Sequence, residues 1–287
     1  MVRRDPHLFG IEGSRWTLDA IKRVCDFLGD ISQGGLSQLL DRLEISWKHS
    51  RDHIHSPDPD YEAKLDYIVG LRDEVRASDG RLVLVYLDEL TYYRQPTLAN
   101  AWEEFGHQAL AQRSHRSNTP SRVVATLDLV TGRVVRRQRS KIDILNLVAF
   151  YRDDLLPTYA QAERIYAVQD NWPVHFHPDV LVGLEPQEQL SRWPEHHPAT
   201  WPSEPSDEAR HKWGNLKLPI QLIRLPTYAS WLNPIEKLWR KLKQELLHLH
   251  SLADNLMELR TKVERFLDQF AFGSLELLRY VGLLKPD

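Results

Sequence analysis

Three short apolar runs in the second part of the sequence constrain the fold most strongly, because each has the length and composition of a buried strand. They are RLVLVYLDEL from Arg81, RIYAVQDN from Arg164 and IQLIRLP from Ile220. A further segment, SRVVATLDLVTGRVVRRQRS, is typical of two strands joined by a turn at Thr131 and Gly132. Helical patterns, one of them over 142–164, separate the later runs. The alternation predicts an α/β fold, in which a mixed sheet of about five strands is flanked by helices.

Three carboxylates follow these runs. Asp88 and Asp170 are expected to end the first two strands, and Glu236 lies at the start of a helix in TYASWLNPIEKLWRKLK after the third. Asn233 is the expected N-cap of that helix, with Pro234 as its first residue and Glu236 as its third. From this segment alone, Glu236 could be a capping residue, and a single aspartate at a strand end could be a loop cap.

The three acids together favour a functional site. Sites in open α/β sheets form at the carboxyl ends of strands. Acids brought together there repel one another unless a divalent cation neutralises them. We therefore expect the carboxyl groups of Asp88, Asp170 and Glu236 to converge on a site for Mg²⁺ or Mn²⁺. Two such ions can support an in-line displacement. Trp231 and Trp239, on either side of Glu236, are expected to fix its helix.

The charge is nearly balanced overall but is unevenly distributed. Lys and Arg total 37 against 40 Asp and Glu, a net charge of -3. Residues 112–141 nevertheless carry eight basic residues and one acid, and the helix after Glu236 adds Lys237, Arg240, Lys241 and Lys243. Such clusters are usually solvated faces, but two on one chain also favour a polyanionic partner. The single cysteine, Cys25, excludes a disulfide framework and a multi-cysteine zinc site.

The N-terminal part has two short helical patterns. One follows Thr17, a plausible N-cap, and the second begins near Ser32. The pair is typical of a helix-turn-helix, with an ordinary helical hairpin as the alternative. On the first interpretation the candidate DNA-binding residues are Gln33, Ser37, Gln38 and Arg42 on the second helix, Lys48 and Arg51 in a following wing, and Arg136 and Arg137 in the basic hairpin. The segment SPDPDYEAK then leads into a linker helix that ends near Ala77.

The blocks VYLDE, AVQDN and LPTYASWLNPIEKLWRKLK closely resemble the three signature blocks of DDE transposases of the mariner-like superfamily, in the bacterial insertion-sequence form. The resemblance covers nearly the whole chain. It implies an RNase H-like catalytic domain with Asp88, Asp170 and Glu236 as catalytic acids that bind two Mg²⁺ or Mn²⁺ ions. It also implies binding to terminal inverted repeats and target DNA, cut-and-paste transposition and a homodimer on DNA. Supporting roles beside the acids are expected for Glu89, Asn171, His175 and Asn233.

The expected domains are a helix-turn-helix or winged domain over 1–56, a linker helix over 57–79 and the catalytic domain over 80–287. Two departures from the family stand out. The chain has room for one helix-turn-helix before the linker where family members commonly carry two. The separation of 66 residues between Asp170 and Glu236 is about twice the usual one. We interpret residues 183–214 as an inserted loop over the active site or at a partner surface.

Two alternatives to a transposase remain open at this stage: an inactive or domesticated DNA-binding protein derived from one, and an RNase H-like nuclease that cuts without joining. No apolar run approaches the length of a membrane span, which is about 18 residues or more. No signal peptide opens the chain. We therefore expect a bacterial cytoplasmic protein associated with the nucleoid and not with a membrane.

Overall fold

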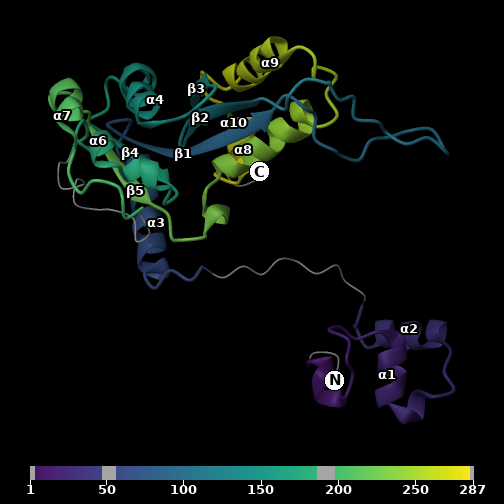
Figure 1. The fold of residues 1–287 in the computed structure, drawn as a ribbon. Helices are drawn as coiled ribbons and strands as arrows, with labels where there is room; N and C mark the ends of the chain where they lie inside the picture. Colours follow the sequence, from purple (N-terminus) through teal and green to yellow (C-terminus); the bar gives the residue numbers. More distant parts are fainter. Residues whose placement is uncertain (1–3, 47–55, 186–197, 285–287) are drawn as a thin grey trace. The chain divides into compact units, whose positions relative to one another are not determined.

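The computed structural model describes residues 4–46, 56–185 and 198–284. The chain forms two compact units, Met1–Ile54 and His55–Asp287, each described here by itself (Figure 1). Two of the candidate DNA-binding residues, Lys48 and Arg51, lie outside the described residues.

The N-terminal unit contains the two expected helices. The helix α1 spans Leu18–Val24 and α2 spans Gln33–Arg42, with 3-10 turns η1 at Pro6–Phe9 and η2 at Asp26–Leu28. Thr17 caps α1 as predicted, because its hydroxyl accepts from the amide of Ala20 at 3.0 Å. Ser32, near which the second helix was expected to begin, caps α2, since its hydroxyl accepts from the amide of Gly35 at 3.0 Å. Leu36 of α2 is fully buried, and Ala20 and Ile21 of α1 are buried as well.

The second unit is built on a five-stranded mixed sheet. Its strands are β1 (Leu82–Tyr93), β2 (Pro120–Asp128), β3 (Val134–Arg139), β4 (Arg164–Gln169) and β5 (Ile220–Arg224). They are arranged in the order β3-β2-β1-β4-β5. The first three strands are antiparallel, and β1, β4 and β5 are parallel. The predicted mixed sheet is therefore confirmed.

Helices cover both faces of this sheet (Figure 1). One face packs against α3 (Tyr61–Ala77), α8 (Ile235–Leu242), α9 (Leu256–Asp268) and α10 (Leu275–Val281). The other packs against α4 (Ile144–Ala149), the π-helix η3 (Phe150–Leu155), α6 (Pro178–Leu181) and α7 (Asp207–Trp213). In β1, Leu84 and Tyr86 point to the first face, whereas Val83 and Val85 point to the second. The remaining short helical segments are α5 (Leu156–Thr158), η4 (Pro173–Phe176), η6 (Ser230–Leu232) and the π-helix η7 (Lys243–Leu247).

The turn between β2 and β3 requires its glycine. Gly132 has a φ of 70°, and a Cβ atom there would lie 2.4 Å from the carbonyl oxygen of Ser274. This close approach lets the hairpin pack against the N-terminus of α10.

The end of β1 differs from the prediction. Asp88 lies inside the strand and not at its end, because β2 pairs with β1 as far as Tyr93. The parallel pairing with β4 stops earlier, at Tyr86 and Val168. Asp88 therefore lies just beyond the point where β4 leaves β1.

The region 183–214 also differs from the predicted loop, as far as the structure describes it. Residues 207–213 form α7, in which Ala209 and Trp213 are buried against the sheet. Ser206 caps this helix and also donates to Asp179 at 3.0 Å. Residues 207–213 of the insertion thus pack on the sheet as a helix, because Ala209 and Trp213 recur at helical spacing.

Candidate active site

The sheet brings the three predicted acids to one edge. Asp88 lies in β1, Asp170 directly follows β4, and Glu236 is the second residue of α8. Continuing the parallel register of β1 and β4 by two residues sets Asp88 level with Asp170. Asp88 is partly buried, whereas Asp170 and Glu236 are exposed.

Trp239 holds the carboxylate of Asp88. Its indole Nε1 donates to Oδ2 of Asp88 at 2.9 Å, and its ring is 2% exposed in the core between α8 and the sheet. Trp239 lies three residues after Glu236, so both side chains project from neighbouring positions of α8. Trp239 packs beneath the helix as expected, whereas Trp231 is exposed in η6. The direct bond from Trp239 to Asp88 was missed, since spacing alone does not reveal a partner on another element.

His175 connects the second acid to Glu89. His175 is fully buried in η4, with Nε2 at 2.9 Å from Oε1 of Glu89 and Nδ1 at 3.4 Å from Oδ1 of Asp170. Glu89 points to the face of the sheet opposite to Asp88, as strand alternation predicts. The ring of Trp172 contacts that of His175 edge-on, with centroids 5.2 Å apart.

Asn171 and Asn233 fix the backbone beside the acids. Asn171 donates to the carbonyl of Leu225 at 2.9 Å and so ties the end of β4 to the end of β5. Asn233 donates to the carbonyl of Leu87 at 3.1 Å. The expectation that Asn233 caps the helix was wrong, because its side chain reaches β1 instead and α8 begins at Ile235 after Pro234. The effect is to join the start of the helix to the residue before Asp88.

The acids perturb one another electrostatically. Burial, together with the charges of Glu236, Glu89 and Asp170, raises the pKa of Asp88 to about 8. Partial desolvation of its carboxyl group and the charge of Asp170 likewise raise the pKa of Glu236, although the charges of Lys243 and Arg240 oppose the shift. Partial desolvation would raise the pKa of Asp170 as well, but the ring of His175, 3.4 Å from its carboxylate, lowers it. Burial would lower the pKa of His175, yet Glu89 and Asp170 raise it to about 10.

These residues fit a hard divalent cation by chemistry. The carboxylates of Asp88, Asp170 and Glu236, which are close enough for Asp170 to raise the pKa of the other two, form an oxygen donor set of the kind that Mg²⁺ and Mn²⁺ prefer. Across 4–46, 56–185 and 198–284, however, no group of three or more His, Cys, Asp or Glu side chains is already arranged as a metal-ligand set. One oxygen of Asp88 is turned to Trp239, and one of Asp170 is turned to the amide of Trp172 at 2.9 Å.

The candidate DNA-binding residues on α2 are exposed. They are Gln33, Ser37, Gln38 and Arg42. Gln33 also donates to Asp19 of α1 at 2.9 Å, which joins the two helices. The structure gives the other three side chains as exposed to solvent, in contrast to the buried Leu36.

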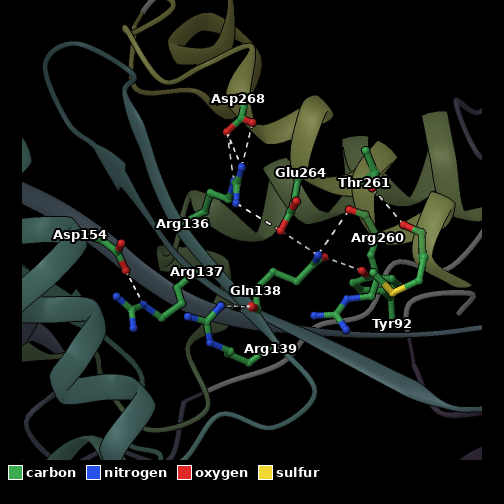
Figure 2. A network of polar contacts seen from close by, with 11 residues as sticks. Tyr92, Arg136, Arg137, Gln138, Arg139, Asp154, Arg260, Thr261, Glu264 and Asp268 are labelled. Atoms are coloured by element: carbon green, nitrogen blue, oxygen red, sulfur yellow. Dashed lines mark hydrogen bonds and ion pairs between the residues drawn. The ribbon is translucent and has the colours of Figure 1, made fainter.

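The arginines of β3 have partners within the chain (Figure 2). Arg136 forms ion pairs with Asp268 at 2.8 Å and Glu264 at 3.5 Å on α9. Arg137 pairs with Asp154 at 2.5 Å. Beside them, Gln138 is buried and joins Tyr92 to Glu264. Much of the positive charge of this hairpin is thus balanced by acids, which composition alone could not show.

The basic residues of α8, together with Lys243 at the start of η7, divide into two pairs. Lys237 donates to the carbonyl of Val281 at 2.8 Å at the end of α10, and Lys241 pairs with Glu245 at 2.5 Å. Arg240 and Lys243 are exposed, and their charges act on Glu236.

Within the described part of the molecule, no helix is long and apolar enough to cross a membrane.

Comparison with known proteins agrees with this geometry. A family model described as DDE superfamily endonuclease matches residues 83–260. An insertion element IS630 uncharacterized 39 kDa protein of Shigella sonnei is 22% identical over 271 residues, which cover 93% of this chain and 68% of that protein.

Solved structures of the Mos1 mariner transposase have a similar fold. The paired-end complex with Mn superposes with a TM-score of 0.56 at 16% identity, over 98% of this chain and 75% of that one. The pre-cleavage Mos1 transpososome gives a TM-score of 0.54 at 14% identity, over 99% of this chain and 76% of that one. The RNase H-like fold and the resemblance to mariner-like and insertion-sequence DDE transposases are confirmed. Because the matched family model covers more than half of its residues, the chain belongs to the DDE superfamily endonucleases.

Proposed function

We propose that this chain is a DNA transposase that cuts and rejoins DNA at the terminal inverted repeats of its own element, with Asp88, Asp170 and Glu236 as catalytic residues. The observation that carries the proposal is the placement of three acids at the edge formed by β1, β4 and α8, close enough for the charges of Glu236 and Asp170 to raise the pKa of Asp88, in a chain of the DDE endonuclease family. Acids placed this close together are suited to binding cations and, through them, phosphate oxygens.

The three acids would hold two divalent ions. Mg²⁺ or Mn²⁺ bound there would activate a water or hydroxyl nucleophile and stabilise the leaving oxygen. The protein's own part is positioning: His175 holds Asp170, Trp239 holds Asp88, and Asn233 holds the start of the helix that carries Glu236. The Mos1 complexes with Mn and with Mg support the choice of metal.

DNA would contact two surfaces. The exposed residues of α2 would read base edges and phosphates, with Lys48 and Arg51 following in sequence. Arg240 and Lys243, next to Glu236, would bind the phosphates of the strand to be cut. Arg136 and Arg137 stay candidates for phosphate binding, although their intrachain acids compete with DNA.

A homodimer on DNA is part of the same proposal. The connection between β1 and β2 carries fully exposed aromatic rings at Trp102 and Phe105, an apolar surface suited to a second copy. The Mos1 relatives were solved as paired-end complexes.

The products of a single assay separate the proposal from its alternatives. The protein is incubated with Mn²⁺, a labelled duplex carrying the element's terminal repeat and a target plasmid. A transposase gives nicked duplex and label joined to the plasmid. A nuclease gives nicks without joined label, and a DNA-binding derivative gives a shifted duplex with neither product.

A further inference from the structure

The segment that follows the N-terminal unit, at Ser56 and Asp58, forms hydrogen bonds with the loop at Thr227 that leads to Glu236. The hydroxyl of Ser56 donates to the carbonyl of Thr227 at 2.6 Å. The amide of Thr227 donates to Oδ2 of Asp58 at 2.8 Å. Both backbone polar groups of one loop residue are therefore bound by two residues that lie about 170 positions earlier in the sequence. We call Ser56, Asp58 and Thr227 the linker clamp.

The carboxylate of Asp58 in the linker clamp is fixed by further hydrogen bonds. The side chain of Asp58 is 2% exposed and also accepts from the amide of Asp60 at 2.9 Å and from Lys64 at 2.6 Å. The amide of Asp58 donates to the hydroxyl of Ser56 at 3.2 Å. Burial would raise the pKa of Asp58, but its partners, with Lys64 foremost, lower it to about 2. A buried carboxylate with this many donors has one orientation, so it fixes the amide of Thr227 in turn.

The loop after the clamp is strained and needs an anchor. Tyr228 has a φ of 54°, a left-handed backbone conformation that a bulky residue seldom adopts. Trp231 in η6 then donates to the hydroxyl of Tyr61 at 3.4 Å, a second contact with the linker segment. At the far end, Asn233 is bound to β1. The loop therefore runs between one anchor on the linker and one beside Asp88, and it enters α8 just before Glu236.

We infer that Ser56 and Asp58 are positioning residues for Glu236, acting through Thr227 and the loop. This inference rests on the proposed catalytic role of Glu236. Loss of the clamp would free Thr227 and let Tyr228 relax to an ordinary backbone conformation. The first turn of α8 would then shift relative to Asp88, and displacements near 1 Å can cost about a hundredfold in rate.

Four variants test the clamp. Ser56→Ala removes one of its bonds, and Ser56→Thr keeps the hydroxyl. Asp58→Ala removes the other bond. Lys64→Met is the matched control, because it removes the ion pair of Asp58 but leaves the bond between Asp58 and Thr227. Each variant is measured for cleavage of the terminal-repeat duplex at saturating DNA, for DNA affinity, and for hydrogen exchange of the amides in 227–232, well below its melting temperature.

We expect Ser56→Ala and Asp58→Ala to lower the cleavage rate about tenfold or more with DNA affinity unchanged. Ser56→Thr should restore the rate, and Lys64→Met should cleave as the wild type does. Hydrogen exchange of the amides in 227–232 should accelerate in Asp58→Ala but not in Lys64→Met. Wild-type rates in both alanine variants, or failure of Ser56→Thr to restore cleavage, would overturn the inference. A wild-type protein that does not cleave would instead refute the proposed function, and unchanged loop exchange in Asp58→Ala would still refute the clamp.

Discussion

Asp88 is the acid of the candidate site whose ionisation is most strongly disfavoured by burial and by neighbouring charges. It is partly buried, its pKa is raised to about 8, and three other acids contribute to that shift. An aspartate whose folded-state pKa lies above its unfolded value of 3.8 adds stability below that value, and this contribution is lost as pH rises through about 8. A bound cation would lower the pKa of Asp88, because it favours the ionised carboxylate.

Replacing this aspartate with asparagine should therefore have a pH-dependent effect on stability. In EDTA, the unfolding free energy of Asp88→Asn relative to that of the wild type should rise by about 3 to 4 kcal/mol from pH 5 to pH 8. Denaturant titrations at both pH values measure the difference, and Asp207→Asn, an exposed aspartate at the start of α7, is the control. A stability difference that is the same at both pH values would show that the pKa of Asp88 is not raised in this way.

His175 should affect catalysis more than binding. It is buried between Glu89 and Asp170, so His175→Asn removes the group that orients the Asp170 carboxylate. We expect cleavage to fall about 10- to 100-fold, as for other residues that orient metal ligands, with DNA affinity retained. Rate and affinity are measured in parallel with His211→Asn, an exposed control on α7. Cleavage equal to that of the control would leave His175 as a packing residue only.

At the scale of elements, the apolar runs predicted the strands well, since buried strands need continuous apolar sequence. The mixed sheet and the helices that flank it followed from their alternation. Two features could not be predicted. The length of β1 beyond Asp88 depends on pairing with β2, and the side chain of Asn233 binds β1 instead of capping the helix because the carbonyl of Leu87 lies within reach. Contacts between distant segments decide both.

The same limit applies to the candidate site. Strand-end positions and the helix start identified the three acids, and alternation placed Glu89 on the opposite face. The partners of Arg136 and the bond from Trp239 to Asp88 come from elements far away in sequence. No local pattern contains that information.

Asp58, which precedes α3, should make the free energy of unfolding depend on pH in the acid range. The pKa of Asp58 is about 2 in the folded chain against 3.8 ordinarily, so its contribution is present above pH 4 and is lost as pH falls through about 2. Above pH 4, we expect Asp58→Asn to cost about 2 kcal/mol of unfolding free energy. The gap to the wild type should close toward pH 2 in denaturant titrations, and Asp60→Asn, with an exposed side chain, is the control. A gap that persists undiminished at pH 2 would contradict the assignment.

For the whole molecule, we propose a division of labour between a DNA-binding domain over 1–56, a linker over 57–79 and a catalytic domain over 80–287. Sequence preference would belong to the first of these and strand cleavage to the last. The nearly neutral net charge of -3 means that DNA binding must depend on local basic surfaces.

The salt dependence of binding can locate these surfaces. Removing one side chain that binds a DNA phosphate reduces the slope of log K against log salt by about 0.9. Arg240→Ala with Lys243→Ala should therefore reduce the slope by about 2 and weaken binding to all sequences, whereas Gln38→Ala should change sequence preference. Lys237→Ala with Lys241→Ala is the matched control on the same helix, since these lysines have intrachain partners. Equal slopes for both double variants would remove Arg240 and Lys243 from the DNA surface.

The central claim is that three carboxylates and divalent metal cut DNA, and Asp170→Asn tests it most directly. The substitution keeps the size of the side chain but removes the charge that would hold the cation. On a labelled duplex carrying the element's terminal repeat, we predict cleavage by the wild type with Mn²⁺ or Mg²⁺, little turnover with Ca²⁺, and none in EDTA. Asp170→Asn should bind the duplex and leave it intact under every condition. Cleavage that survives in Asp170→Asn, or that proceeds undiminished in EDTA, would contradict the claim.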